Sequence, residues 1–104
     1  MITPEIAVYA AGLFDGEGSF NMNGGSPSNI YIEIGSTHKN TLLWCREHFK
    51  GTIREQAPGG PRKKVFYMWR VYKKDDALTF MRTILPFSIT RKTDLLAYLE
   101  VYGK

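Results

Sequence analysis

Residues 8–20 read Val-Tyr-Ala-Ala-Gly-Leu-Phe-Asp-Gly-Glu-Gly-Ser-Phe, and this stretch decides how we expect the chain to fold. Its first half is apolar and carries small side chains at helical spacing, so a second backbone can approach one helical face closely. The small positions are Ala7, Val8, Ala11 and Gly12. In the second half, two glycines permit the left-handed backbone that ends a helix, with Glu17 between them. We therefore expect a carboxylate at the tip of a helix.

The segments on either side extend this pattern. Thr3 is a good helix cap and Pro4 suits the first helical position, which predicts a helix from about Pro4 to Phe14. Polar and apolar residues then alternate from Ser19 to Asn23 and again in residues 30–34, across a turn rich in Gly and Ser. This pattern predicts two strands.

The rest of the chain repeats the order of helix and strands. The sequence predicts a helix over residues 40–49 capped by Asn40, strands over 52–56 and 64–72, a helix from 74 that Pro86 breaks, and a last helix over 90–102. The order is αββαββα plus a final helix. We expect an α+β fold in one domain, residues 1–104, with four antiparallel strands and the helices on one face of the sheet.

Composition narrows the class of protein. The net charge of +4 and a pI near 9.3 suit a polyanionic partner. One cysteine, Cys45, and two histidines provide neither an internal disulfide nor a zinc motif, and Cys45 is expected to be a buried structural thiol. The sequence contains neither a run long enough to span a membrane nor a signal-peptide pattern, so a soluble, intracellular protein without a membrane partner is expected.

Residues 10–18, Ala-Ala-Gly-Leu-Phe-Asp-Gly-Glu-Gly, resemble the signature of the LAGLIDADG homing endonucleases. Each difference keeps the apolar, small or acidic character of its position. Weaker matches follow in family-like order at residues 49–53, 67–71, 73–75 and 85–87, so that the resemblance covers most of the chain. No second copy of the acidic motif is present in the sequence. The chain therefore carries half of a two-motif site and resembles the single-motif, homodimeric type.

One face of the predicted sheet is open and carries amide, basic and aromatic groups. Such groups bond to base edges and phosphates, and a β-ribbon fits the major groove of double-stranded DNA. An ordinary solvated face explains the same composition, and the family motif favours DNA. The predicted DNA-binding residues are Ser19, Asn21, Asn23, Tyr31, Glu33, Arg54, Gln56, Lys64, Phe66, Met68, Arg70, Tyr72 and Lys92.

The motif helix allows two interpretations. Two copies packed across a two-fold axis would bring two Glu17 side chains together, and paired carboxylates beside a phosphate backbone are ligands for Mg²⁺. Alternatively, the small residues pack against the chain's own core and Glu17 caps a nearby group. The resemblance implies the first, with a dimer interface at Ala7, Val8, Ala11, Gly12 and Asp15.

The resemblance also implies metal-dependent cleavage of DNA. Mg²⁺ or Mn²⁺ is expected at Glu17 and the adjoining Gly16, without a further small-molecule cofactor. Ser36 stands where family members often have a glutamine that orders water, and Arg91 stands where lysine is more usual. Both are candidate catalytic residues. Their departure from the family pattern puts the rate of cleavage in doubt. Asp15 is expected to fix the turn and the interface and not to bind metal.

These observations predict a homing endonuclease that cuts a long, near-palindromic DNA site as a homodimer. A second hypothesis keeps the DNA-binding saddle without the chemistry, as a DNA binder or an intron-RNA maturase. A third hypothesis is a domain that mediates only protein contacts.

Overall fold

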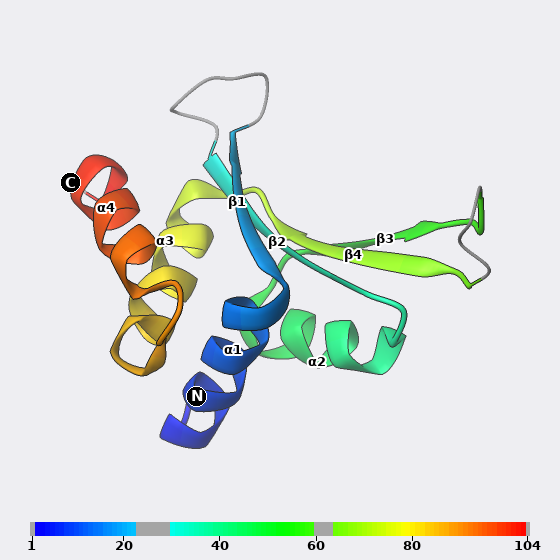
Figure 1. Ribbon diagram of the computed structural model, residues 1–104, viewed down its shortest axis with the longest axis horizontal. Coiled ribbons are helices and arrows are strands. Elements are labelled where there is room, and N and C mark those ends of the chain that lie inside the picture. Colours follow the sequence, from blue (N-terminus) through cyan, green and yellow to red (C-terminus); the bar gives the residue numbers. More distant parts are fainter. Residues whose placement is uncertain (1, 23–29, 60–63, 104) are drawn as a thin grey trace.

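The computed structural model describes residues 2–22, 30–59 and 64–103, in the predicted order of helices and strands (Figure 1). The elements are α1 (Pro4–Glu17), β1 (Gly18–Met22), β2 (Ile30–Ser36), α2 (Lys39–Phe49), β3 (Thr52–Gln56), β4 (Phe66–Val71), α3 (Lys74–Ile84), the 3₁₀ helix η3 (Leu85–Phe87) and α4 (Lys92–Tyr102). This order confirms the predicted αββαββα fold with a final helix.

The four strands form one sheet in the order β1-β2-β4-β3, and each neighbouring pair is antiparallel. Helices α1, α2 and α3 contact one side of this sheet, whereas α4 packs beside α3. The β3–β4 hairpin extends beyond the helices (Figure 1). No helix of the described residues covers the other side of the sheet, as the sequence predicts (Figure 1). Hereafter we call that side the open face.

Alternation along the strands separates the core from the open face. Ile30, Ile32 and Ile34 are buried on β2, and Trp69 and Val71 are buried on β4. The alternation predicted for residues 30–34 is therefore confirmed, whereas on β4 Tyr67 is only partly buried. The buried indole also meets its need for a hydrogen-bond acceptor, because its Nε1 donates to the carbonyl of residue 50 at 2.7 Å.

The start of α1 is as predicted, but its end is not. Thr3 caps the helix by accepting a hydrogen bond from the Ile6 amide at 3.2 Å. The helix continues to Glu17, and Gly18 is extended with φ −86°, so the predicted left-handed turn is wrong. Glycine serves a steric purpose there, because a Cβ on Gly18 would overlap the ring of Phe14.

The start of α2 differs from the prediction, whereas its end at Phe49 and the start of β3 at Thr52 are as predicted. His38, not Asn40, occupies the N-cap position of α2, and its side chain makes no capping hydrogen bond. The left-handed glycine lies at Gly51, with φ 96°, where α2 turns into β3. A Cβ on Gly51 would lie 2.6 Å from the Trp69 Nε1 atom, so the core excludes any larger residue.

Cys45 lies fully buried on α2, and burial raises the pKa of its thiol to about 12. The predicted structural thiol is thus confirmed, because such a group is not a nucleophile at neutral pH. Of the helices in the described ranges, none combines the length and apolar character needed to cross a lipid bilayer.

Candidate active site and nucleic-acid interface

Glu17 is exposed at the junction between α1 and β1. It is the last residue of the helix, and Gly18 begins the strand without an intervening loop. The last turn of α1 contains no basic residue. Because the carbonyl end of a helix carries partial negative charge, this carboxylate lies where a cation is favoured. Gly16 is exposed beside it, in the last turn of the helix.

Asp15 does not face solvent freely but binds the segment before α4. One carboxylate oxygen accepts a hydrogen bond from the Ser88 hydroxyl at 2.5 Å, and the other accepts from the amides of Ile89 at 2.7 Å and Thr90 at 3.3 Å. Burial acts to raise the pKa of Asp15, but these hydrogen bonds outweigh it and lower the pKa below 3.8. The same bonds explain why α4 begins at Lys92 and not at residue 90.

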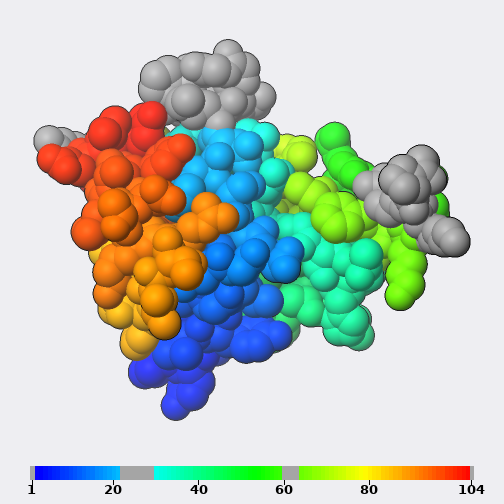
Figure 2. Space-filling model, in the orientation of Figure 1, coloured from blue at the N-terminus to red at the C-terminus, as the bar shows by residue number. Residues whose placement is uncertain are grey.

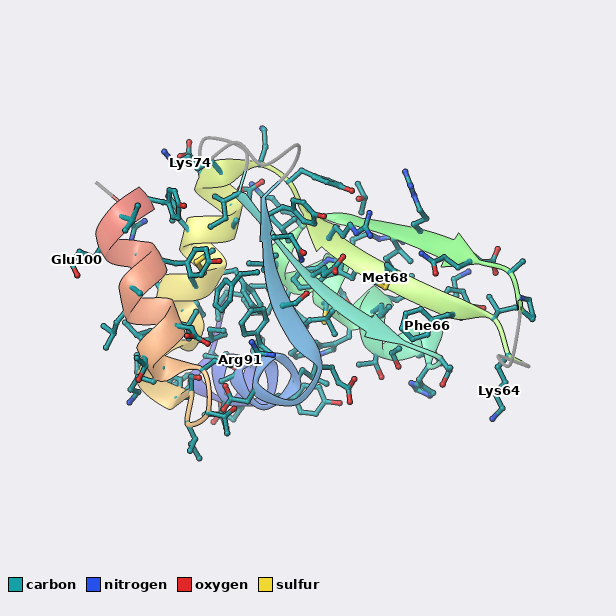
Figure 3. The ribbon with its side chains drawn as sticks, turned by 45° about the horizontal axis from the view of Figure 1, so that its top comes forward. Lys64, Phe66, Met68, Lys74, Arg91 and Glu100 are labelled. Carbon is teal, nitrogen blue, oxygen red and sulfur yellow. The ribbon has the colours of Figure 1, made fainter. Side chains whose placement is uncertain are left out.

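Arg91 follows this bound segment and points to the end of α1 (Figure 3). Its guanidinium donates a hydrogen bond to the Gly18 carbonyl at 2.5 Å and lies 5.8 Å from the centre of the Phe14 ring. The fold therefore brings Arg91 next to the residue that follows Glu17, although 73 positions separate Gly18 from Arg91 in the sequence. A guanidinium has five N–H donors, and this bond occupies one of them.

Ser36 ends β2 at the same end of the sheet. Ile34 pairs with Gly18, so Ser36 lies two residues further along, towards the last turn of α1. Its hydroxyl accepts a hydrogen bond from the His38 amide at 2.9 Å. This hydroxyl thus supports the entry into α2. Glu17, Ser36 and Arg91, which are far apart in the sequence, are placed at one end of the sheet.

The exposed Glu17 carboxylate is a possible ligand for a divalent cation. Within residues 2–22, 30–59 and 64–103, no group of three or more His, Cys, Asp or Glu side chains converges. Mg²⁺ usually takes one or two carboxylates, and water and phosphate oxygens complete its coordination. One carboxylate, Glu17, is thus compatible with the few protein ligands that Mg²⁺ needs.

The exposed side of α1 is a shallow groove of small and apolar residues, lined by Val8, Tyr9, Gly12, Leu13, Gly16 and Glu17. Figure 2 shows this helix as a blue strip on the surface between α4 and α2. Ala7 and Ala11 are not part of the strip, because they are 4% and 0% exposed in the chain's own core. Their predicted place at a dimer interface is therefore wrong, whereas Val8 and Gly12 are exposed.

The open face carries most of the predicted DNA-binding residues. Strand register places on it Ser19, Asn21, Tyr31, Glu33, Arg54, Gln56, Phe66, Met68, Arg70 and Tyr72. Phe66 and Met68 lie side by side over Gly35, where a Cβ would meet both side chains (Figure 3). Lys64 is exposed just before β4.

Lys92, another predicted DNA-binding residue, begins α4 beside Arg91 and lies off the sheet. Asn23 lies outside the described residues. Thr52, which the prediction omits, is exposed on the open face opposite Arg70, and its alternation with Arg54 and Gln56 was the available signal.

A hydrogen-bond network covers the inner part of the open face. Glu33 accepts from the Ser19 hydroxyl at 3.2 Å and from the Arg70 Nε at 2.7 Å. Asn21 donates to Ser19 at 3.1 Å, and Arg70 also donates to the Tyr72 hydroxyl at 3.0 Å. The network joins β1, β2 and β4, and sequence reasoning could not detect it because its members come from different strands.

Comparison with known proteins identifies the fold. No protein-family model and no curated protein matches the sequence. Among solved structures, the homing endonuclease I-CvuI, determined with a DNA target in the presence of Mg, has a TM-score of 0.74 at 16% identity, over 94% of this chain and 66% of that one. The archaeal intron-encoded homing endonuclease I-Vdi141I, complexed with DNA, has a TM-score of 0.69 at 22% identity, over 93% and 66%.

The group I intron-encoded homing endonuclease I-CeuI, also complexed with DNA, has a TM-score of 0.66 at 19% identity over 99% of this chain. This chain spans 56% of the length of I-CeuI and about two thirds of the other two. The chain therefore has the homing endonuclease fold that the sequence predicts.

Proposed function

We propose that the chain is a site-specific DNA endonuclease that acts as a homodimer on a long, near-palindromic target. The observation that carries the proposal is the position of Glu17, which ends α1 and directly precedes β1. One side of this junction is the exposed groove of α1, and the other is the open face of the sheet. A single carboxylate thus stands where a subunit interface and a nucleic-acid surface would meet.

Dimerisation would occur through the exposed groove of α1. Gly12 and Gly16 lie in this groove, and a Cβ on either would meet nothing within 4 Å. The space beside both glycines allows a second helix to approach closely. A two-fold axis there would place the two Glu17 side chains near each other and extend the two open faces into one saddle.

DNA would lie along the open face. The six residues of β4 cover roughly 20 Å at about 3.3 Å per residue, which corresponds to about six base pairs at ~3.4 Å each. Lys64 and Arg54 are exposed on this side and suit phosphate contacts. Two copies would therefore read two half-sites of opposite orientation, as a near-palindrome requires.

The chemistry would take place at the ends of the two α1 helices. The Glu17 carboxylate of each chain, with the adjoining Gly16 carbonyl, would hold Mg²⁺ or Mn²⁺. When bound, such a cation lowers the pKa of water and stabilises charge on phosphate oxygens. Arg91 would direct its remaining N–H donors to the phosphate and stabilise negative charge there. Ser36 would fix the approach of water from the end of β2.

The test is a selection for cleaved duplexes from a randomised near-palindromic library with Mg²⁺, for the parent and Glu17→Gln. We expect the parent to cut a defined set of duplexes. The variant should retain the same duplexes without cutting them, because the amide is a poor ligand for Mg²⁺. Cleavage by Glu17→Gln at the parental rate would contradict the assignment of Glu17.

A second candidate is a nucleic-acid-binding protein that does not cleave, either a DNA binder or an intron-RNA maturase. The observation in its favour is that the Ser36 hydroxyl and the Arg91 guanidinium already have partners in the chain. Retention of duplexes by both proteins without cleavage, in Mg²⁺ or Mn²⁺, would support this candidate. Failure to bind any duplex or intron RNA at low salt would leave a domain for protein contacts.

A further inference from the structure

We propose that Arg70 reads a guanine in each half-site and that Glu33 is the positioning residue that orients Arg70. This inference rests on the proposed binding of DNA to the open face and assigns two different roles on it. Sequence reasoning places both residues among the base-contacting groups. Their geometry gives them different roles: Arg70 contacts the base, and Glu33 holds Arg70 in position.

The two residues form a close ion pair in the centre of the sheet. Glu33 and Arg70 are directly opposite each other on β2 and β4, and the Arg70 Nε lies 2.7 Å from the Glu33 Oε2. Their side chains are only 16% and 21% exposed. A pair with so little exposure is less screened by solvent than a surface ion pair, so it holds the guanidinium in one orientation.

The surroundings of Arg70 reduce its freedom further. Its NH1 donates to the Tyr72 hydroxyl at 3.0 Å, and its guanidinium lies 5.7 Å from the centre of the Tyr31 ring. The two tyrosine rings contact each other at 4.9 Å between centroids. Arg70 is thus fixed from three directions before any DNA binds, which reduces the entropy lost on binding.

The donors that remain suit guanine. Glu33 takes the Nε–H and Tyr72 takes one N–H of NH1, so three of the five donors of Arg70 have no partner among the described residues. The free donors belong to NH1 and NH2, and this pair of nitrogens matches the O6 and N7 acceptors of guanine in the major groove. Bidentate Arg–guanine contact is the commonest specific contact of this kind.

Glu33 itself is poorly placed to read a base. Its Oε1 accepts from Ser19, and its Oε2 accepts from Arg70, so both oxygens already have donors. A bare carboxylate would also repel the phosphates, whereas the paired one is neutralised by its partner. The contribution of Glu33 to recognition therefore passes through Arg70.

Arg54 provides a matched control on the same face. It is exposed on β3 and makes no hydrogen bond or ion pair with any residue that the structure describes. Within the described part of the chain no side chain fixes the direction of Arg54, so it can follow a phosphate. We expect its loss to lower affinity for all sequences about equally.

The experiment measures base preference by selection from the randomised library without divalent cations, so that binding alone is scored. The proteins are the parent, Arg70→Ala, Arg70→Lys, Glu33→Gln, the double variant Glu33→Gln/Arg70→Ala, and Arg54→Ala. Arg70→Lys keeps the positive charge but replaces the rigid planar guanidinium by a single ammonium on a flexible stem. Each protein is first checked for cooperative thermal unfolding.

We expect Arg70→Ala to lose preference for G·C at one base pair per half-site and to bind the parental consensus about 10- to 100-fold more weakly, with a smaller loss of preference in Arg70→Lys. Glu33→Gln should weaken preference at that same base pair. In the Arg70→Ala background it should change nothing further there. A uniform loss of affinity in Arg70→Ala, without loss of preference at any position, would show a phosphate contact and overturn the proposal.

A chemical change in the DNA tests the same contact with the unaltered protein. Replacing guanines of the consensus one at a time with 7-deazaguanine removes the N7 acceptor. We expect one guanine in each half-site to show a loss, and unchanged binding at every guanine would overturn the proposal. A parent that selects no duplex would refute the proposed function as well, whereas a parent with a clear consensus that does not depend on Arg70 would refute only this inference.

Discussion

The two sides of α1 use small residues for opposite reasons. On the buried side, Ala7, Ala10 and Ala11 are between 0% and 4% exposed, because the sheet and α3 leave no room for larger side chains. On the exposed side, Gly12 and Gly16 have nothing within 4 Å of an added Cβ. The chain's own packing explains the alanines and gives no reason for the glycines.

This difference supports the exposed side of α1 as the proposed dimer interface. A glycine inside a helix costs about 0.5–1 kcal/mol relative to alanine. Two such residues on the exposed side of one helix therefore reduce the stability of the isolated chain without relieving any contact within it. A second backbone that packs there would supply the reason. Three predictions test this contrast, in order of their expected effect on folding.

The largest effect should come from adding one methyl group where α1 meets β1. In Gly18→Ala the new Cβ would overlap the Phe14 ring, which is held by edge contacts with Phe20 and Phe80. We expect a loss of about 3 kcal/mol in the free energy of unfolding, measured by urea denaturation. The control Gly16→Ala, two residues earlier, should be neutral or slightly stabilising. Equal changes in the free energy of unfolding in Gly18→Ala and Gly16→Ala would contradict this contrast between buried and exposed small residues.

Asp15→Asn should have an intermediate effect. Both oxygens of Asp15 accept hydrogen bonds, and the amide nitrogen of asparagine cannot replace one of them. We expect a loss of about 1–2 kcal/mol at pH 7. Because hydrogen bonds lower the pKa of Asp15 in the folded chain, its contribution is present above pH 3.8 and is lost as the pH falls through the lowered pKa.

The pH dependence separates this carboxylate from a general effect of the substitution. Urea denaturation at pH 7 and at pH 2 should show the parent and Asp15→Asn converging in stability at the lower pH. A difference that stays constant over this range would mean that the charge of Asp15 is not what holds residues 88–90.

The smallest effect on folding, with a large effect on association, is expected for Gly12→Leu. The side chain enters open space, and leucine is a better helix former than glycine, so the chain should gain about 0.5–1 kcal/mol. In sedimentation equilibrium the parent should be a dimer and Gly12→Leu a monomer, because leucine forces the two helices apart. A dimeric Gly12→Leu would place the interface elsewhere. The neighbouring Ala11→Leu should instead destabilise the fold, since its site is fully buried.

Local patterns in the sequence predict most of the fold. Alternation identifies the buried isoleucines of β2, and the Thr3-Pro4 pair identifies the start of α1, because both signals depend on nearest neighbours along the chain. The resemblance to the LAGLIDADG family predicts Glu17 and Arg91 as site residues. The structure adds that Arg91 reaches the Gly18 carbonyl.

Other features could not be predicted, because they depend on which elements pack together. A helical stripe of small residues does not reveal which side faces the sheet, so Ala7 and Ala11 were assigned to the wrong surface. The end of α1 was misplaced because Gly18 is required by the Phe14 ring and not by a left-handed turn. Glu33 and Arg70 pair across two strands and are 37 positions apart in the sequence, so no local pattern predicts their contact.

The direct passage from Glu17 to Gly18 has a consequence for the spacing of a DNA target. No loop separates α1 from β1, and Arg91 holds the Gly18 carbonyl, so the joint has little freedom to bend. In the proposed dimer, the distance and the rotation between the two half-sites would then be fixed by the protein. One base pair inserted at the centre of the target shifts a half-site by about 3.4 Å and turns it by about 35°. A protein with this joint should tolerate base changes within a half-site far better than a change in the number of base pairs between the half-sites.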